Sequence, residues 1–304
     1  MKQAISLRTG TLTVTMDPLS APIEDLCGFG SRSNPKRGFL FVSKVLGKHI
    51  PVRASIMLSS HHNLVRQLPQ KLGGAVFIGM AETATGLGQG VFEAYRSFTG
   101  SHDTAYIQTT RYVMDGAEPI EFDEPHSHAV RQFLYVPEDR PTRTQLEHCH
   151  TLVLVDDEIS TGTTLCNLVT ACRTFNSGIN RVVLVCLTDF SQGGAADRVR
   201  AIPGIGEVTT VALVSGQFEF SADAQFQHEP AQTSASAVGC RRHLMTPYSA
   251  RLGTTAEITL PPGLIARCLE VCGPRTLIVG TGEFMHPAFC LAHALEEAGR
   301  TQDA

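Results

Sequence analysis

The strongest structural signal in this 304-residue chain is the segment Val153-Leu154-Val155-Asp156-Asp157-Glu158-Ile159-Ser160-Thr161-Gly162-Thr163-Thr164-Leu165. Its first residues are apolar and β-branched, which is typical of a central parallel strand covered on both faces. Carboxylates follow, then a loop of hydroxyl side chains around a glycine, and a helix is predicted from about Leu165. The loop would lie at the carboxyl end of its strand, where open α/β sheets bind their ligands.

This loop has the composition of a phosphate-binding site. Gly162 lets the backbone approach an anion, and the next helix would point its free N–H groups and positive dipole end at the same place. Hydroxyl groups come from Ser160, Thr161, Thr163 and Thr164. The preceding carboxylates would repel phosphate alone, so they suit a ligand that also carries vicinal hydroxyls, or a Mg²⁺ ion. A phosphate beside a diol, with a metal nearby, describes a ribose 5-phosphate unit.

The run from Asp156 to Thr164 resembles the phosphoribosyl-pyrophosphate (PRPP) motif of type I phosphoribosyltransferases. The resemblance implies that Asp156 and Asp157 are the catalytic carboxylates and hold the ribose hydroxyls, while the hydroxyl loop binds the 5-phosphate. Glu158 departs from the family, which mostly has an apolar residue there; this third carboxylate would either help to hold Mg²⁺ or face solvent. No direct protein ligand to a metal is predicted. Another strand–loop–helix phosphate site is the alternative, and a Walker P-loop is disfavoured because no Gly-Lys-Ser/Thr follows.

A second strand, small-residue loop and helix are predicted from Phe77-Ile78-Gly79-Met80-Ala81-Glu82-Thr83-Ala84-Thr85-Gly86-Leu87-Gly88. Such a loop can present backbone N–H groups to an anion. Taken alone, it is more often a sign of tight packing. Its position upstream of the Asp-Asp motif resembles the pyrophosphate loop of the family, which implies pyrophosphate contacts by Met80, Ala81, Glu82 and Thr83.

A long polar segment runs from Arg111 to His128, and a loop of this length in a compact domain is usually functional or disordered. The family resemblance implies a mobile loop that covers the transition state and excludes water, to which Arg111, His126 and His128 would contribute. The histidines would reach the leaving pyrophosphate or act as acid/base groups near neutral pH. A solvated loop with incidental histidines is the alternative.

Cations gather before a helix predicted over Arg37–Leu46. Arg32, Lys36 and Arg37 would oppose the dipole of that helix, which favours an anionic ligand or the acceptor site over a solvated helix start. This stretch, the loop over residues 79–88 and the segment Glu124-Pro125-His126-Ser127-His128 are considered together. They resemble the orotate-phosphoribosyltransferase-like proteins of bacterial tellurium-resistance and stress gene clusters. Their C-terminal TRSP domain is similar to the stretch 280–287, Gly-Thr-Gly-Glu-Phe-Met-His-Pro, but the Thr-Arg-Ser-Pro segment that names the domain is missing, so a partial unit is expected.

Alternating strand and helix signals predict an α/β fold with a doubly wound, mostly parallel sheet and a smaller α/β C-terminal unit. Three parts are predicted: a phosphoribosyltransferase-like domain over 1–220, a linker or irregular connection over 221–255, and a partial TRSP-like unit over 256–304. The first has an edge strand at Thr11–Thr15 and further strands at 75–79, 105–110, 152–155, 181–187 and 208–214. The last has a helix over Leu264–Val271 and a strand over Thr276–Val279.

Composition is that of an ordinary globular enzyme, with 42% apolar and 18% charged residues. A net charge of −4 gives no reason to expect a nucleic acid or a membrane surface as a partner, and no apolar stretch approaches the ~20 residues of a membrane span. Nine cysteines without a Cys-x-x-Cys pair suit a reduced, cytoplasmic compartment.

The sequence therefore predicts a Mg²⁺-dependent phosphoribosyltransferase that uses PRPP and a nitrogenous base, in either direction, to make a nucleotide- or nucleoside-like metabolite in a stress response. A homodimer is expected from the fold. A non-catalytic module that senses PRPP or a nucleotide is the main alternative. A third possibility places acid/base chemistry on Glu283 and His286 of the C-terminal unit.

Overall fold

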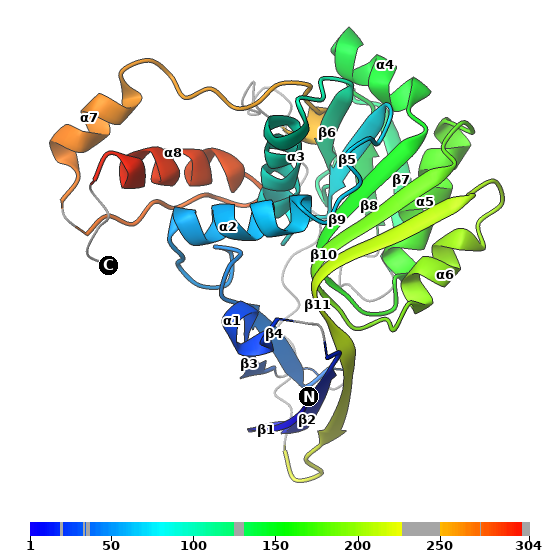
Figure 1. Cartoon of the computed structure of the whole chain (residues 1–304), viewed down its shortest axis with the longest axis vertical. Coiled ribbons are helices and arrows are strands. Elements are labelled where there is room, and N and C mark those ends of the chain that lie inside the picture. The colour runs from blue at the N-terminus through cyan, green and yellow to red at the C-terminus, as the bar shows by residue number, and fades with distance from the viewer. Residues whose placement is uncertain are drawn as a thin grey trace.

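The computed structural model describes residues 1–18, 21–32, 34, 37–124, 131–226, 250–273 and 275–299. At its centre lies a seven-stranded sheet in the order β1-β2-β11-β10-β9-β5-β6 (Figure 1). Neighbouring strands from β11 to β6 are parallel, whereas β1 and β2 are antiparallel. The predicted α/β fold with a mostly parallel sheet is confirmed. The strands are β1 (Lys2–Leu7), β2 (Gly10–Met16), β5 (Ala75–Gly79), β6 (Thr104–Gln108), β9 (Thr151–Ile159), β10 (Arg181–Asp189) and β11 (Glu207–Ala222).

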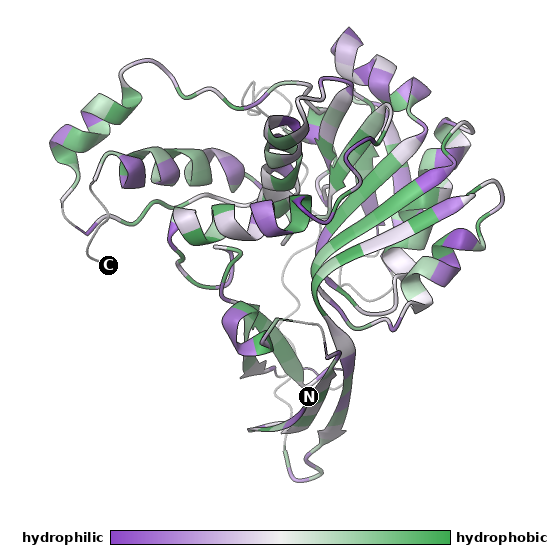
Figure 2. Cartoon of the chain, in the orientation of Figure 1, coloured by the Kyte–Doolittle hydropathy of each residue, from purple (hydrophilic) through white to green (hydrophobic). Residues whose placement is uncertain are grey.

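Helices cover both faces of this sheet. On one face α3 (Thr85–Thr99) packs on β5, β6 and β9, and α2 (Ala54–Val65) packs on α3 and on β10 and β11. On the other face lie α4 (Arg140–His148), α5 (Thr163–Phe175) and α6 (Gly194–Arg200). Apolar residues concentrate on the central strands between these layers (Figure 2). Because β5 is covered on both faces, all five of its residues are buried.

Before α2, the chain forms an antiparallel hairpin, β3 (Cys27–Ser31) and β4 (Phe39–Ser43), preceded by the short helix α1 (Ile23–Leu26). The helix predicted over Arg37–Leu46 is therefore wrong. Phe39, Phe41 and Ser43 are buried while Leu40 and Val42 are half-exposed, which is the two-residue period of a strand. Both rings pack against Phe218 of β11, so tertiary contacts fix this period.

The strand predicted at Thr11–Thr15 exists, but it does not lie at the edge. β2 pairs with β1 on one side and with the second half of β11 on the other, where Gly10 to Met16 lie opposite Ala222 to Gly216. β11 is also longer than predicted and runs past the boundary proposed at residue 220. The antiparallel pairing with β2 explains this length, because it gives the extra residues hydrogen-bond partners.

The described part of the long polar segment is not a structureless loop. β7 (Pro119–Asp123) and β8 (Arg131–Tyr135) form an antiparallel pair in which Ile120 and Phe122 point to the buried side. Lys36, His126 and His128 lie outside the described residues.

The C-terminal part contains a 3-10 turn, η2 (Ala250–Leu252), and the helices α7 (Leu264–Val271) and α8 (His286–Glu297). The helix predicted over Leu264–Val271 is confirmed, but the strand predicted over Thr276–Val279 is wrong. Leu277 and Val279 are 66% and 70% exposed, and the free edge at β6 is bridged by Thr254 instead. The proposed division at 221–255 stays a prediction, since 227–249 lie outside the described residues.

Helix α8 docks on the outer side of α2 and α3 (Figure 1). Phe289 packs on Ala54 and Met57. The Glu296 carboxylate accepts hydrogen bonds from the Ser55 N–H at 2.9 Å and from its hydroxyl at 2.6 Å, at the first turn of α2. A carboxylate there satisfies unpaired helix N–H groups and complements the helix dipole. Among the helices of the described residues, none has the length and apolar character that a membrane span requires.

Helix α3 lies so close to β5 that a side chain at Gly88 cannot fit. A Cβ there would come within 2.7 Å of the Gly79 Cα, a backbone atom that cannot rotate away. We expect Gly88→Ala to lower the free energy of unfolding by about 1–3 kcal/mol through overpacking, although alanine favours helices. Urea denaturation measures this.

The matched control for this substitution is Gly194→Ala in α6, where a Cβ would meet nothing within 4 Å. It should be neutral or slightly stabilising. Equal stability of Gly88→Ala and wild type would contradict the packing of α3 on β5.

Candidate active site

The two loops predicted to bind anions meet at one edge of the sheet. β5 lies beside β9 in parallel register, with Gly79 opposite Val155. The Met80 N–H extends this pairing by donating to the Val155 carbonyl at 2.9 Å. Consequently Met80 emerges next to Asp156, and the residues that follow both strands share one site.

The acidic run lies within β9, which continues to Ile159, so these carboxylates belong to a strand and not to a loop. Asp156 and Asp157 are half-buried, and the Asp157 N–H donates to Asp156 Oδ1 at 2.9 Å. Burial, reinforced by the neighbouring Asp157 charge, raises the pKa of Asp156 well above its usual range. Burial also raises the pKa of Asp157, and the Asp156 hydrogen bond, His49 and Arg37 oppose that rise. Burial of the pair therefore disfavours its charged form.

Glu158 is matched by a cation from the β3–β4 hairpin. Nη2 of Arg37 lies 2.7 Å and 2.9 Å from the two Glu158 carboxylate oxygens, and its guanidinium lies 4.8 Å from the Phe39 ring centre. Burial raises the pKa of Glu158, and the Arg37 charge opposes this rise. Two predicted site residues thus bind each other. Arg32 is exposed, and its N–H donates to the Gly38 carbonyl at 2.9 Å.

The hydroxyl loop turns at Gly162, whose φ of +71° favours glycine. A Cβ there would also lie 2.5 Å from the Ala195 Cβ of α6, so the loop is pressed against the next helix. Helix α5 starts at Thr163, and its N-cap residue Gly162 makes no side-chain cap hydrogen bond, while the Thr163 N–H donates to Thr161 Oγ1 at 3.4 Å. The Thr163 hydroxyl donates to Thr161 Oγ1 at 3.1 Å. Free N–H groups and hydroxyls here suit an anion such as phosphate.

The loop after β5 offers its backbone more than its side chains. Met80 and Ala81 are buried, whereas Glu82 and Thr83 are half-exposed. The Ala81 N–H donates to Thr109 Oγ1 at 2.8 Å, which ties the loop to the end of β6. The peptide bond between Ala81 and Glu82 is cis.

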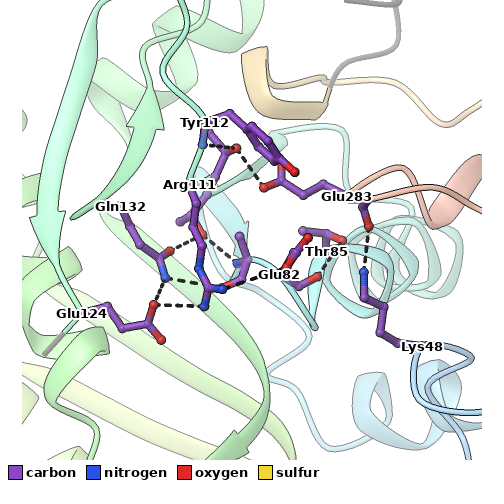
Figure 3. Close-up of polar contacts among 12 residues, drawn as sticks. Lys48, Glu82, Thr85, Arg111, Tyr112, Glu124, Gln132 and Glu283 are labelled. Carbon is purple, nitrogen blue, oxygen red and sulfur yellow. Dashed lines mark hydrogen bonds and ion pairs between the residues drawn. The ribbon is translucent and has the colours of Figure 1, made fainter. Parts of the chain in front are cut away.

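Arg111 lies over this loop, between two carboxylates (Figure 3). Its Nη2 is 3.2 Å from Glu124 Oε2 and its Nη1 is 3.9 Å from Glu82 Oε2. Gln132 donates to the same Glu124 oxygen and accepts from the Thr109 hydroxyl at 3.2 Å. The predicted pyrophosphate loop and the residue predicted to cover it are therefore in contact.

The C-terminal unit reaches this region through Glu283, which is 2% exposed. Its carboxylate pairs with Arg251 and accepts from the Thr110 hydroxyl at 2.8 Å, next to Arg111 (Figure 3). Nearby, Lys48 donates to the Gly282 carbonyl at 2.7 Å. His286 is equally buried, and its Nε2 lies 3.0 Å from Glu93 Oε2. These contacts favour anchoring roles for Glu283 and His286 over acid/base chemistry on a solvent-borne substrate.

Sequence reasoning missed several polar residues of the site. Glu124, Gln132 and Thr109 bind the Arg111 side chain or the adjacent loop, and His49 faces Asp157. Each is a single polar residue at the end of a strand or in a turn. No local motif marks such positions, and only tertiary structure brings them together, through the pairing of β5 with β6, the β7–β8 hairpin and the bridge between Thr110 and Phe133.

Comparison with known protein families identifies the family of this chain. Residues 26–217, more than half of the chain, match the sequence model of a family described as phosphoribosyl transferase. No curated protein matches the chain. Among solved structures, it is similar to adenine phosphoribosyltransferase from Trypanosoma brucei (13% identity over 64% of this chain and 80% of that one, TM-score 0.43). It is also similar to orotate phosphoribosyltransferase from Aeropyrum pernix (20% identity over 58% and 79%, TM-score 0.33). The chain belongs to the phosphoribosyl transferase family and is a phosphoribosyltransferase.

Proposed function

We propose that this enzyme is a Mg²⁺-dependent phosphoribosyltransferase that joins the ribose 5-phosphate of PRPP to a nitrogenous base and releases pyrophosphate, or runs the reverse reaction. The observation that carries the proposal is the half-buried pair Asp156 and Asp157 in the last part of β9, flanked by two loops suited to anions. A ligand with a ribose diol between two phosphate groups matches this arrangement, because its hydroxyls would meet the carboxylates and its phosphate groups would meet the two loops.

In this proposal, Asp156 and Asp157 accept hydrogen bonds from the ribose hydroxyls. Their negative charge also stabilises the positive charge that develops at ribose C1 as pyrophosphate leaves. The residues Ser160, Thr161, Gly162, Thr163 and Thr164 hold the 5-phosphate, and the backbone from Met80 to Thr83 holds pyrophosphate. The base attacks C1, so that a carbon–nitrogen bond forms while the carbon–oxygen bond to pyrophosphate breaks.

The donor set of the site fits Mg²⁺. Carboxylates outnumber cations here: Glu82, Glu124, Asp156, Asp157 and Glu158 face only Arg37 and Arg111 among the described ion pairs. Hard oxygen donors with excess negative charge suit this ion, which usually binds through one or two carboxylates plus substrate phosphates. When bound with PRPP, Mg²⁺ would supply positive charge to the pyrophosphate oxygens, and the carboxylates of this site would balance its charge.

We assign Arg111 to the departing pyrophosphate. Its present carboxylate partners are 20% to 38% exposed, so an incoming anion can replace them at modest cost. His126 and His128 are proposed to lie in the same covering segment. The acceptor base is proposed to enter beside the β3–β4 hairpin, where Arg32, Lys36 and Arg37 are candidates for its recognition.

The wider setting rests on the resemblance of the chain to proteins of tellurium-resistance and stress gene clusters. Within it, residues 280–287 would belong to a TRSP-like unit, and the product would be a nucleotide- or nucleoside-like metabolite. A cytoplasmic location is supported by the described cysteines, which form no disulfide with one another. A homodimer remains a proposal from the fold.

PRPP binding by calorimetry, with and without Mg²⁺, tests the function together with pyrophosphate release against a panel of bases. We expect Asp156→Asn/Asp157→Asn to weaken Mg²⁺-dependent binding by roughly 10–100-fold for each charge-assisted hydrogen bond lost. Asp115→Asn, at an exposed aspartate, is the matched control. Binding without turnover for every base would indicate a PRPP-sensing module, and absence of binding would refute the ribose-phosphate site.

The acidic pair should cost stability in the free enzyme. Because the folded state raises the pKa of Asp156 above its unfolded value, the contribution of this group is favourable at low pH and is lost as pH rises. We expect Asp156→Asn to stabilise the PRPP-free enzyme at pH 7–8 by about 0.5–2 kcal/mol, with the gain vanishing near pH 4. Thermal unfolding across this range measures it. A variant less stable than wild type at pH 8 would contradict the idea.

Arg111 should act on the chemical step. We expect Arg111→Gln to lower kcat by roughly 10²–10³, as for loss of one group that stabilises developing charge, with less effect on PRPP affinity. Arg131→Gln is the control. The Arg131 side chain is 74% exposed, and its Nη1 lies 3.7 Å from Glu121 Oε2 within the β7–β8 hairpin. Equal rates for the two variants would remove Arg111 from the mechanism.

A further inference from the structure

Three side chains of different chemistry converge between α3 and α8, away from the residues assigned to PRPP. Glu93 comes from α3, and His286 and Cys290 lie four residues apart on one face of α8. One carboxylate oxygen, one imidazole nitrogen and one thiol sulfur lie within 4.8 Å of one another. We propose that this cluster binds a single thiophilic divalent cation of the Zn²⁺ class, which fastens the C-terminal helix to the catalytic domain.

The donor set selects the kind of metal. Thiolate, imidazole and carboxylate are the three ligand types that zinc takes in proteins, usually in a four-coordinate arrangement that water can complete. Mg²⁺ and Ca²⁺ bind oxygen donors and would leave Cys290 unused. The proposed site is therefore chemically separate from any Mg²⁺ that accompanies PRPP.

The imidazole is buried without proper hydrogen-bond partners. His286 is 2% exposed, and among the described residues neither ring nitrogen makes a well-formed hydrogen bond, although Nε2 lies 3.0 Å from Glu93 Oε2. Buried polar groups are normally satisfied, so a buried imidazole with close polar neighbours but no well-formed hydrogen bond is a specific deficit. A metal ion bound by the imidazole, the carboxylate and the thiolate would remove it.

The carboxylate is held in the orientation that a ligand needs. Glu93 Oε1 accepts from the Ile258 N–H at 3.1 Å and from the Gln89 amide at 3.4 Å, which leaves Oε2 directed at His286. Hydrogen bonds of this kind orient metal ligands. Glu93 is 19% exposed and Cys290 is half-buried without a disulfide, so a metal ion can enter from their side.

Glycines on α3 permit the close approach that the site requires. A Cβ at Gly86 would lie 2.9 Å from the Met285 Cβ, and one at Gly90 would lie 2.2 Å from His61 Cε1. Absence of both side chains lets the start of α8 reach the surface of α3 about two turns before Glu93, and the His61 ring about one turn before it. The three ligands are thus carried by two packed helices and not by loops.

The site has a structural consequence for the C-terminal unit. Glu283, three residues before His286, contacts Thr110 beside Arg111. A metal ion between α3 and α8 would hold this segment against the catalytic domain independently of PRPP. A variant can therefore lose metal binding and keep pyrophosphate release, or the reverse.

Cobalt substitution tests the site on the full chain after treatment with a chelator. Co²⁺ bound through a thiolate gives a sulfur-to-metal charge-transfer band, which carboxylate sites such as Asp156 and Asp157 do not give. We expect a band that saturates at one equivalent, is displaced by Zn²⁺, persists in Asp156→Asn, and disappears in Cys290→Ser. Cys166→Ser, at a half-buried cysteine of α5, is the matched control and should keep the band.

Affinity and stability provide a second measurement. Loss of a residue that only orients a metal ligand typically weakens metal binding by ~10–100-fold, and we expect His286→Gln to weaken Zn²⁺ binding by more than this. We also expect Zn²⁺ to raise the Tm of wild type but not that of Cys290→Ser. If these variants do not fold, alkylation of wild type decides, since Zn²⁺ should protect Cys290 and not Cys166. Absence of a thiolate band, a band retained in Cys290→Ser, or equal alkylation of Cys290 with and without Zn²⁺ would overturn the proposal.

Discussion

The parallel pairing of β9 with β5 on one side and β10 on the other is the constraint from which the site follows. It places Gly79 opposite Val155 and brings two loops distant in sequence to one sheet edge. The same pairing continues through the acidic run, with Asp156 opposite Cys186, and so holds carboxylates inside a sheet and raises their pKa values. The position of the ligand loops and the raised pKa values of the acidic pair are thus consequences of one set of main-chain hydrogen bonds.

Cations reach this acidic edge from segments outside the central sheet. Arg37 comes from the β3–β4 hairpin and meets Glu158, while Arg111 follows β6 and lies between Glu82 and Glu124. In each case an arginine is held near the site by carboxylates that are only partly exposed. These carboxylates keep both arginines close to the site. An anionic substrate would compete with the carboxylates for the arginine side chains.

Polar contacts join the C-terminal unit to the domain, and the Glu283 and His286 side chains among them are buried. Glu283 meets Arg251 and Thr110, His286 meets Glu93, and Glu296 meets the start of α2. Glu283–Arg251 is a buried ion pair, and removing one partner of such a pair leaves an uncompensated charge, which typically costs ~3–5 kcal/mol. These contacts therefore fix where α8 lies, and they make the C-terminal helices part of the surroundings of the active site.

Local sequence determined the strand–loop–helix units, the glycine turn at Gly162 and the extent of α7, because each depends on residues close in the chain. Local sequence failed where contacts between distant segments decide the structure. Residues 37–46 contain a strand and not a helix, since Phe39 and Phe41 pack on β11. Residues 276–279 form no strand, and the edge of β6 is bridged by Thr254 instead. The acidic pair was predictable from its motif, whereas the Arg37–Glu158 pair, the Glu124–Arg111 contact and the Glu93–His286–Cys290 cluster were not. These join residues far apart in sequence, and only tertiary packing brings their side chains together.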